Sequence, residues 1–126
     1  MKEGATHAVG IDLGTTNSAL AWQPLGDERA APQVLPIPQL VHPGEAADRA
    51  LLPSYLYLPH AAELSGEALR LPWSAPGELP RDLVGELARA LGALTPIRLV
   101  SSAKSWLCHP TLDRRAASLP VGSPEE

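Results

Sequence analysis

The residues best suited to chemistry lie in one stretch near the N-terminus, residues 10–18. Asp12 follows an apolar run, and an aspartate at the end of a buried strand can hold Mg²⁺, usually through water. Gly14 lets the backbone turn and approach a ligand closely. Successive backbone N–H groups in such a turn form an anion-binding nest. The hydroxyls of Thr15 and Thr16 add further donors. The stretch therefore predicts a site for a metal-bound phosphate group.

Asn17, the only asparagine in the chain, closes this turn and is expected to contact either the ligand or the turn backbone. The same residue types also occur in ordinary strand–turn–strand corners, where Asp and Thr side chains bond to their own turn. That alternative stays open on the residues alone. The sequence contains neither Gly-x-x-x-x-Gly-Lys-Ser/Thr nor Gly-x-Gly-x-x-Gly, so a Walker-type or Rossmann-type nucleotide site is not supported.

Lys104 stands out because the chain contains eight arginines and only one other lysine, Lys2. A lysine in the middle of such a chain suggests a need for a compact ammonium group rather than a planar guanidinium. An ordinary surface lysine is the alternative. Residues 98–115 around it are basic, although the whole chain has a net charge of -4. This segment could face a small anion or be a solvated surface stripe.

Residues 11–18, Ile-Asp-Leu-Gly-Thr-Thr-Asn-Ser, resemble the first phosphate motif of the seventy-kilodalton heat-shock chaperones (DnaK-like). These chaperones belong to the actin and sugar-kinase ATPase superfamily. Four later segments resemble successive parts of the family's nucleotide-binding domain: residues 32–35, 52–57, 84–88 and 102–107. Pro96 also precedes Lys104 by eight residues, a spacing that the family shares. The segment after Lys104 lacks the family's usual Gly-Arg pair and resembles a bacterial subgroup of large, divergent DnaK-like proteins.

The resemblance implies that Lys104 and Asp12 are catalytic. Lys104 would reach the γ-phosphate and the attacking water, and Asp12 would hold the metal. The residues implied to bind the nucleotide are Gly14, Thr15, Thr16 and Asn17. The implied cofactors are ATP and Mg²⁺, and the implied ligands are ATP and ADP. Unfolded client proteins and co-chaperones would bind through regions that this sequence does not contain.

The resemblance covers residues 8–120 and only part of the family's nucleotide-binding domain. We therefore expect residues 1–126 to be an incomplete N-terminal part of that domain, unable to turn over ATP alone. Two alternatives remain. A sugar-kinase-like enzyme fragment would share the first motif but leave Ser102, Ala103 and Lys104 unexplained. A non-catalytic, vestigial interaction protein could keep the N-terminal strands without the chemistry.

The expected fold class is α/β: a partial actin-like ATPase lobe with a mixed sheet, opened by an N-terminal β-hairpin. Apolar residues on both sides of the turn, at 8–13 and 18–22, predict that hairpin. Further strands are expected within 33–41, 51–58, 67–71 and 97–100, a loop over 42–50, a helical turn in 111–117 and a disordered end over 118–126. Leucine periodicity predicts a helix over 82–94. The resemblance instead implies a strand at 83–84 and a helix that starts after Gly85.

Composition limits the remaining possibilities. The 126 residues include 14 Pro and 10 Gly but no Phe, so we expect exposed sheet edges and weak independent folding. No apolar run is long enough for a membrane helix. Glu3, His7 and Asp12 stand where a signal peptide would be apolar. The single Cys108 excludes an internal disulfide. These points predict a cytoplasmic protein, and the acidic net charge argues against nucleic-acid binding.

Overall fold

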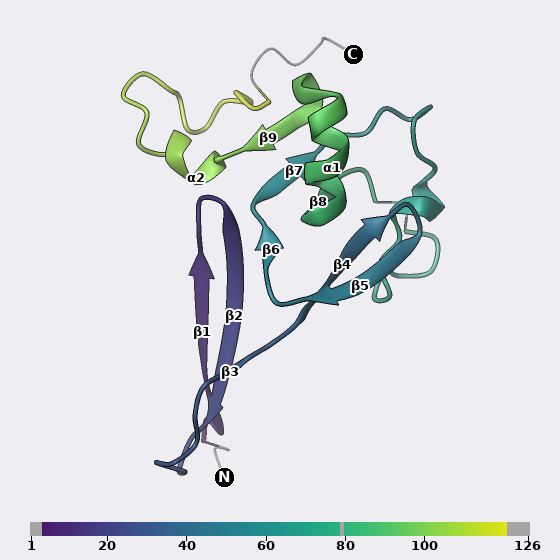
Figure 1. The fold of residues 1–126 in the computed structure, drawn as a ribbon. Helices are drawn as coiled ribbons and strands as arrows, with labels where there is room; N and C mark the ends of the chain where they lie inside the picture. The colour runs from purple at the N-terminus through teal and green to yellow at the C-terminus, as the bar shows by residue number, and fades with distance from the viewer. Residues whose placement is uncertain (1–3, 79, 121–126) are drawn as a thin grey trace.

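The computed structural model describes residues 4–78 and 80–120, which form a small α/β fold (Figure 1). Its described strands make three antiparallel sheets, with strand orders β1-β2-β3, β4-β5 and β8-β7-β9, and β6 pairs with β2. The single mixed sheet that the sequence suggested is thus divided into three small sheets. Residues 121–126 of the predicted disordered end lie outside the described residues.

The N-terminal hairpin is confirmed. β1 (His7–Leu13) pairs with β2 (Asn17–Pro24) in a register that runs from His7↔Pro24 to Leu13↔Ser18. Two short strands, β3 (Gln33–Val34) and β6 (Leu52–Pro53), pair with opposite ends of β2. β1 is exposed along its whole length and has β2 as its only partner among the described strands. In Figure 1 the hairpin extends away from the rest of the molecule, with its turn beneath α2 (Ala103–Trp106).

The body of the protein is built around β7 (Tyr55–Tyr57), which lies between β8 (Leu83–Val84) and β9 (Leu99–Ser101). Helix α1 (Glu86–Leu94) packs against this sheet through Leu87 and Ala88. The core consists of Leu40, Tyr57, Leu69, Leu83, Leu87 and Ala88. Tyr57 is fully buried, at 0% exposure, and its hydroxyl donates to both oxygens of Glu63, at 2.8 and 2.9 Å.

Helix α1 begins at Glu86, as the resemblance implied, and not at residue 82, as the leucine periodicity predicted. The chain turns at Gly85, where φ is +83° and a Cβ would lie 2.6 Å from Gln39 Oε1. Gln39 is only 2% exposed, and its Oε1 accepts from the N–H of Glu86 at 2.9 Å. Its Nε2 donates to Leu51 O, also at 2.9 Å. A buried amide therefore caps the helix, and only a glycine lets it approach so closely.

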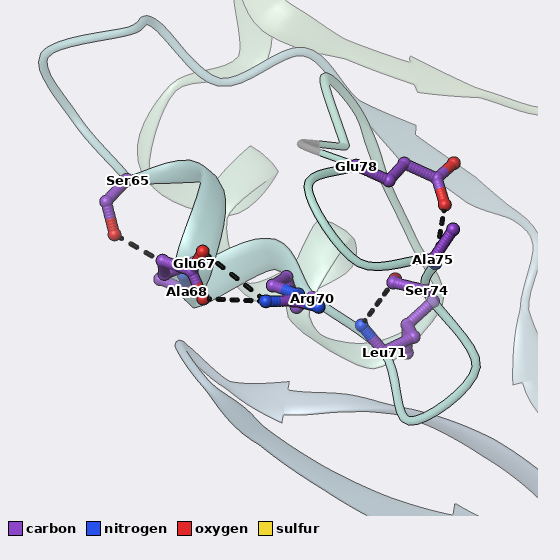
Figure 2. Close-up of polar contacts among 8 residues, drawn as sticks. All are labelled: Ser65, Glu67, Ala68, Arg70, Leu71, Ser74, Ala75 and Glu78. Carbon is purple, nitrogen blue, oxygen red and sulfur yellow. Dashed lines mark hydrogen bonds and ion pairs between the residues drawn. The ribbon is translucent and has the colours of Figure 1, made fainter.

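Two predictions about the middle of the chain are wrong. Residues 42–50 are not all loop, because β5 (Glu45–Arg49) pairs with β4 (Ile37–His42) after a turn at Gly44, where φ is +75°. Residues 67–71 do not form a strand, because the chain makes the short 3-10 helix η1 (Gly66–Leu69). Figure 2 shows how Ser65 Oγ accepts from Ala68 N–H, while Arg70 pairs with Glu67 at 3.2 Å. Local polar bonds favour the helical turn over an extended chain.

Two boundaries near the C-terminus also differ. The strand expected over 97–100 is β9 (Leu99–Ser101), which follows the 3-10 turn η2 (Pro96–Arg98). Pro96 starts that turn, a position that suits proline because its fixed φ is helical. Where a helical turn was expected in 111–117, the chain makes one hydrogen-bonded turn and no helix, with Ala116 N–H donating to Asp113 O at 3.2 Å.

Candidate phosphate-binding site

The candidate site is the turn of residues 14–16, between the ends of β1 and β2. A Cβ on Gly14 would collide with the backbone oxygen of Asn17, so the turn closes this tightly only with a glycine. Thr15 and Thr16 are exposed, and Asn17 is partly buried as the first residue of β2. The turn thus brings together the four residues expected to bind the nucleotide, because they are consecutive in the sequence: Gly14, Thr15, Thr16 and Asn17.

The body of the protein holds this turn by its carbonyl groups. Lys104 Nζ donates to Leu13 O at 2.7 Å. Ser54 donates twice, through Oγ to Gly14 O at 2.8 Å and through its backbone N–H to Thr16 O at 2.9 Å. Three carbonyls within four residues are therefore bonded to donors from distant parts of the chain. A carbonyl bonded in this way cannot turn toward a bound anion and repel it.

The N–H groups of the turn, unlike its carbonyl groups, have no hydrogen-bond partner among the described residues. Those of Thr15 and Thr16 donate to no acceptor within residues 4–78 and 80–120. Both residues are exposed, so their N–H and hydroxyl groups are open to a ligand from solvent. Adjacent N–H donors with no protein acceptor are the elements of an anion-binding nest. The arrangement fits a phosphate better than a cation.

Lys104 reaches this turn from the other end of the chain, 91 positions away. It lies in α2, which follows β9 through Ser102. Ser102 has φ +52° and ψ +32°, a left-handed conformation that is uncommon for a residue with a side chain. This sharp turn places α2 next to the hairpin (Figure 1). An ammonium group has three donors, so two remain on Lys104 after its bond to Leu13 O.

Asp12 lies on β1, opposite Ala19, one residue before the carbonyl that Lys104 holds. It is exposed, and no ion pair joins it to Lys104 or to any other described residue. Successive strand residues point to opposite faces, so its carboxylate and the Leu13 side chain lie on different faces of the hairpin. Asp12 therefore adjoins the residue whose carbonyl Lys104 bonds, but no ion pair joins the two catalytic candidates to each other.

The donor set limits what metal could bind. No group of three or more His, Cys, Asp or Glu side chains within the described ranges could hold a metal ion. Asp12 alone cannot form a protein cage. Mg²⁺, however, commonly keeps several waters and uses one carboxylate together with substrate phosphates. The residues present therefore fit a magnesium–phosphate complex, and they do not fit a metal site made by the protein alone.

The basic segment does not converge on the turn. Arg98 donates to Leu58 O at 3.1 Å, and Arg114 Nε donates to Leu107 O at 2.6 Å, so both guanidinium groups bond to backbone carbonyls. Cys108 is exposed, and His109 next to it stacks on Trp106 with ring centroids 5.5 Å apart. Within the described part of this segment, Lys104 is the basic residue that bonds to the hairpin.

Ser54 was not among the predicted site residues. It lies in residues 52–57, which were expected to form a strand and resemble a strand of the chaperone family, and nothing in its residue type distinguishes it from the other serines of the chain. The weak signal that could have found it is its position after Pro53, where a strand is interrupted. In the structure it separates β6 from β7 and is partly buried.

No protein-family model matches this chain, and no curated protein or solved structure is significantly similar to it. Among the described residues, no helix has the length and apolar character needed to cross a membrane.

Proposed function

We propose that this chain binds ATP as its Mg²⁺ complex, with the phosphate tail at the turn of residues 14–17. In this proposal it is the N-terminal part of an actin-like ATPase lobe from a DnaK-like, ATP-dependent protein-folding chaperone. One observation carries the proposal: the turn carbonyls are bonded to Lys104 and Ser54, while the N–H groups of Thr15 and Thr16 have no acceptor among the described residues.

Each residue has a distinct part in this binding. The N–H and hydroxyl groups of Thr15 and Thr16 donate to phosphate oxygens. The two remaining donors of Lys104 form charge-assisted hydrogen bonds to the same phosphate tail, and such bonds are stronger than neutral ones. Asp12 holds Mg²⁺ through its water shell. A bound Mg²⁺ ion would neutralise part of the charge of the phosphate tail.

The wider proposal concerns parts outside this chain. ATP and ADP are the direct ligands, whereas unfolded client proteins and co-chaperones would bind elsewhere in a complete chaperone. A cytoplasmic location fits that role. The support for this part is the resemblance of residues 11–18 and 102–107, together with the contact between these two segments through Lys104 and Leu13.

The test is calorimetric titration of the chain with Mg·ATP, using Lys104→Ala and Arg115→Ala as a matched pair. Both variants remove one positive charge from the same exposed segment, but only Lys104 bonds to the hairpin. We expect saturable binding by the wild type and a loss of about tenfold or more in affinity for Lys104→Ala, the size of a charge-assisted bond. Arg115→Ala should change affinity by less than about twofold.

In a parallel titration followed by NMR, the amide chemical shifts of Thr15 and Thr16 should change most. Absence of saturable binding by the wild type contradicts the proposal. So does an equal loss in both variants, because that result indicates general attraction of an anion to a basic segment. Shift changes confined to residues far from the turn would place the nucleotide elsewhere.

A second candidate function is binding of another protein through the hairpin. It corresponds to the alternative of a non-catalytic, vestigial interaction protein. Val9, Ile11 and Leu13 are 62%, 66% and 64% exposed and lie on one face of β1. The strand also has an unpaired outer edge within the described structure. Exposed apolar strands of this kind pair readily with another strand. Sedimentation that shows tight self-association, combined with no Mg·ATP binding, would favour this candidate over the first.

A further inference from the structure

We infer that Ser54 is a positioning residue for the phosphate turn: its hydroxyl holds the Gly14 carbonyl and thereby directs the N–H of Thr15 toward the ligand. This inference rests on the proposed function and extends it to a residue outside the motif. Ser54 lies between β6, which belongs to the hairpin's sheet, and β7, which belongs to the core sheet. It thus connects the site with the most buried part of the protein.

The peptide bond between Gly14 and Thr15 is planar, which couples the directions of its two polar groups. Gly14 C=O and Thr15 N–H belong to one peptide group, and in a trans peptide they point in opposite directions. Ser54 Oγ holds Gly14 O at 2.8 Å, on the side of the body. The N–H of Thr15 must therefore point away from Ser54. It finds no acceptor there among the described residues.

A second contact makes the arrangement rigid. The backbone N–H of Ser54 donates to Thr16 O at 2.9 Å, so one residue holds carbonyls on both sides of Thr15. Ser18 Oγ lies 3.3 Å from Ser54 Oγ and further restricts the hydroxyl. A turn that is already in its binding conformation loses less entropy when a ligand arrives. Removing only the hydroxyl frees the Gly14–Thr15 peptide and leaves the second contact in place.

The test compares three variants: Ser54→Ala, Ser54→Thr and Ser74→Ala. Threonine keeps the hydroxyl that alanine removes. Ser74 is the matched control because its Oγ also accepts or donates within the chain, here accepting from Leu71 N–H at 3.0 Å (Figure 2), but within the described structure it makes no hydrogen bond to the turn. The ligands are Mg·ATP and inorganic tripolyphosphate. Ser54→Ala should weaken both by about tenfold, the effect of losing one well-placed hydrogen bond. Ser54→Thr and Ser74→Ala should stay within about threefold of the wild type.

A second measurement needs no ligand. Nitrogen relaxation of the unliganded chain should show faster motion of the Thr15 amide in Ser54→Ala, with unchanged amides in the paired residues Gly10 and Ala21. If the wild type binds neither ligand, the proposed function fails, and relaxation alone decides whether Ser54 orders the turn. An unchanged Thr15 amide overturns the inference. Failure of Ser54→Thr to restore the wild-type behaviour, or global unfolding of Ser54→Ala, also overturns it, because either result assigns Ser54 a general structural role.

Discussion

At the scale of single residues, the hydrogen bonds to the backbone carbonyls of residues 13–16 define the site more than the types of its side chains do. Thr15 and Thr16 could occupy any exposed turn. What distinguishes this turn is that donors from Lys104 and Ser54 bind its carbonyls and leave N–H groups open. A glycine at position 14 is necessary for this geometry, because a Cβ would collide with Asn17 O.

Two glycines of the hairpin test this requirement. Gly14→Ala should distort the turn, lower the free energy of unfolding by about 1–3 kcal/mol and remove Mg·ATP binding. Gly10→Ala is the control, since a Cβ at Gly10 meets nothing within 4 Å and alanine loses less backbone entropy than glycine. Urea denaturation and calorimetry measure both effects. Equal behaviour of the two variants would show that the tight turn is not needed.

At the scale of elements, the hydrogen bonds from the buried Tyr57 to the exposed Glu63 tie β7 to the loop before η1. Burial, and then the hydrogen bond to Glu63, raise the pKa of the Tyr57 phenol above its ordinary value of 10.0. The folded state therefore holds this proton more tightly than the unfolded state. Stability from this group is complete below pH 10 and is lost as the pH rises from there through the raised pKa.

Replacing Tyr57 by Phe should remove this part of the pH dependence. We expect Tyr57→Phe to cost about 1 kcal/mol at neutral pH, because the Glu63 carboxylate loses its donor. Above pH 10 the gap between variant and wild type should narrow, since the wild type loses stability that the variant no longer has. Urea denaturation across this range measures it. Tyr55→Phe keeps Tyr57 and should decline like the wild type, and a parallel decline in Tyr57→Phe would contradict the assignment.

Elements set by local signals could be predicted from the sequence, and those set by distant contacts could not. The hairpin followed from two apolar runs around Gly14. The start of α1 did not follow from leucine periodicity, which predicted residue 82; the family resemblance implied a start after Gly85. The β4–β5 hairpin was missed because β5 consists of Glu, Ala, Ala, Asp and Arg, which have little preference for strands and extend only by pairing with β4. Ser54 acts 40 positions from Gly14, so its role depends on tertiary structure.

At the scale of the whole molecule, the hairpin joins the body mainly at the end that carries the turn. Ser54 and Lys104 bond to that end, and β6 pairs with β2 at Asn17 and Ser18. The remainder of β1 stays exposed, including its apolar residues. This agrees with the expectation of exposed sheet edges. It also means that the proposed site is open to solvent, because Asp12, Thr15, Thr16 and Lys104 are all exposed.

An open site of this kind should bind a nucleotide without hydrolysing it. Phosphoryl transfer needs an attacking water held in line and a charge-stabilising environment that excludes other water. Among the described residues, nothing encloses the turn on its solvent side, so the phosphate tail would remain hydrated. We expect the 126-residue chain to release phosphate from Mg·ATP at the rate of the buffer alone in a phosphate-release assay. Lys104→Ala, which removes the amine at the turn, should give the same rate. Steady hydrolysis by the wild type that disappears in Lys104→Ala would contradict this prediction and show that the turn, Asp12 and Lys104 suffice for catalysis.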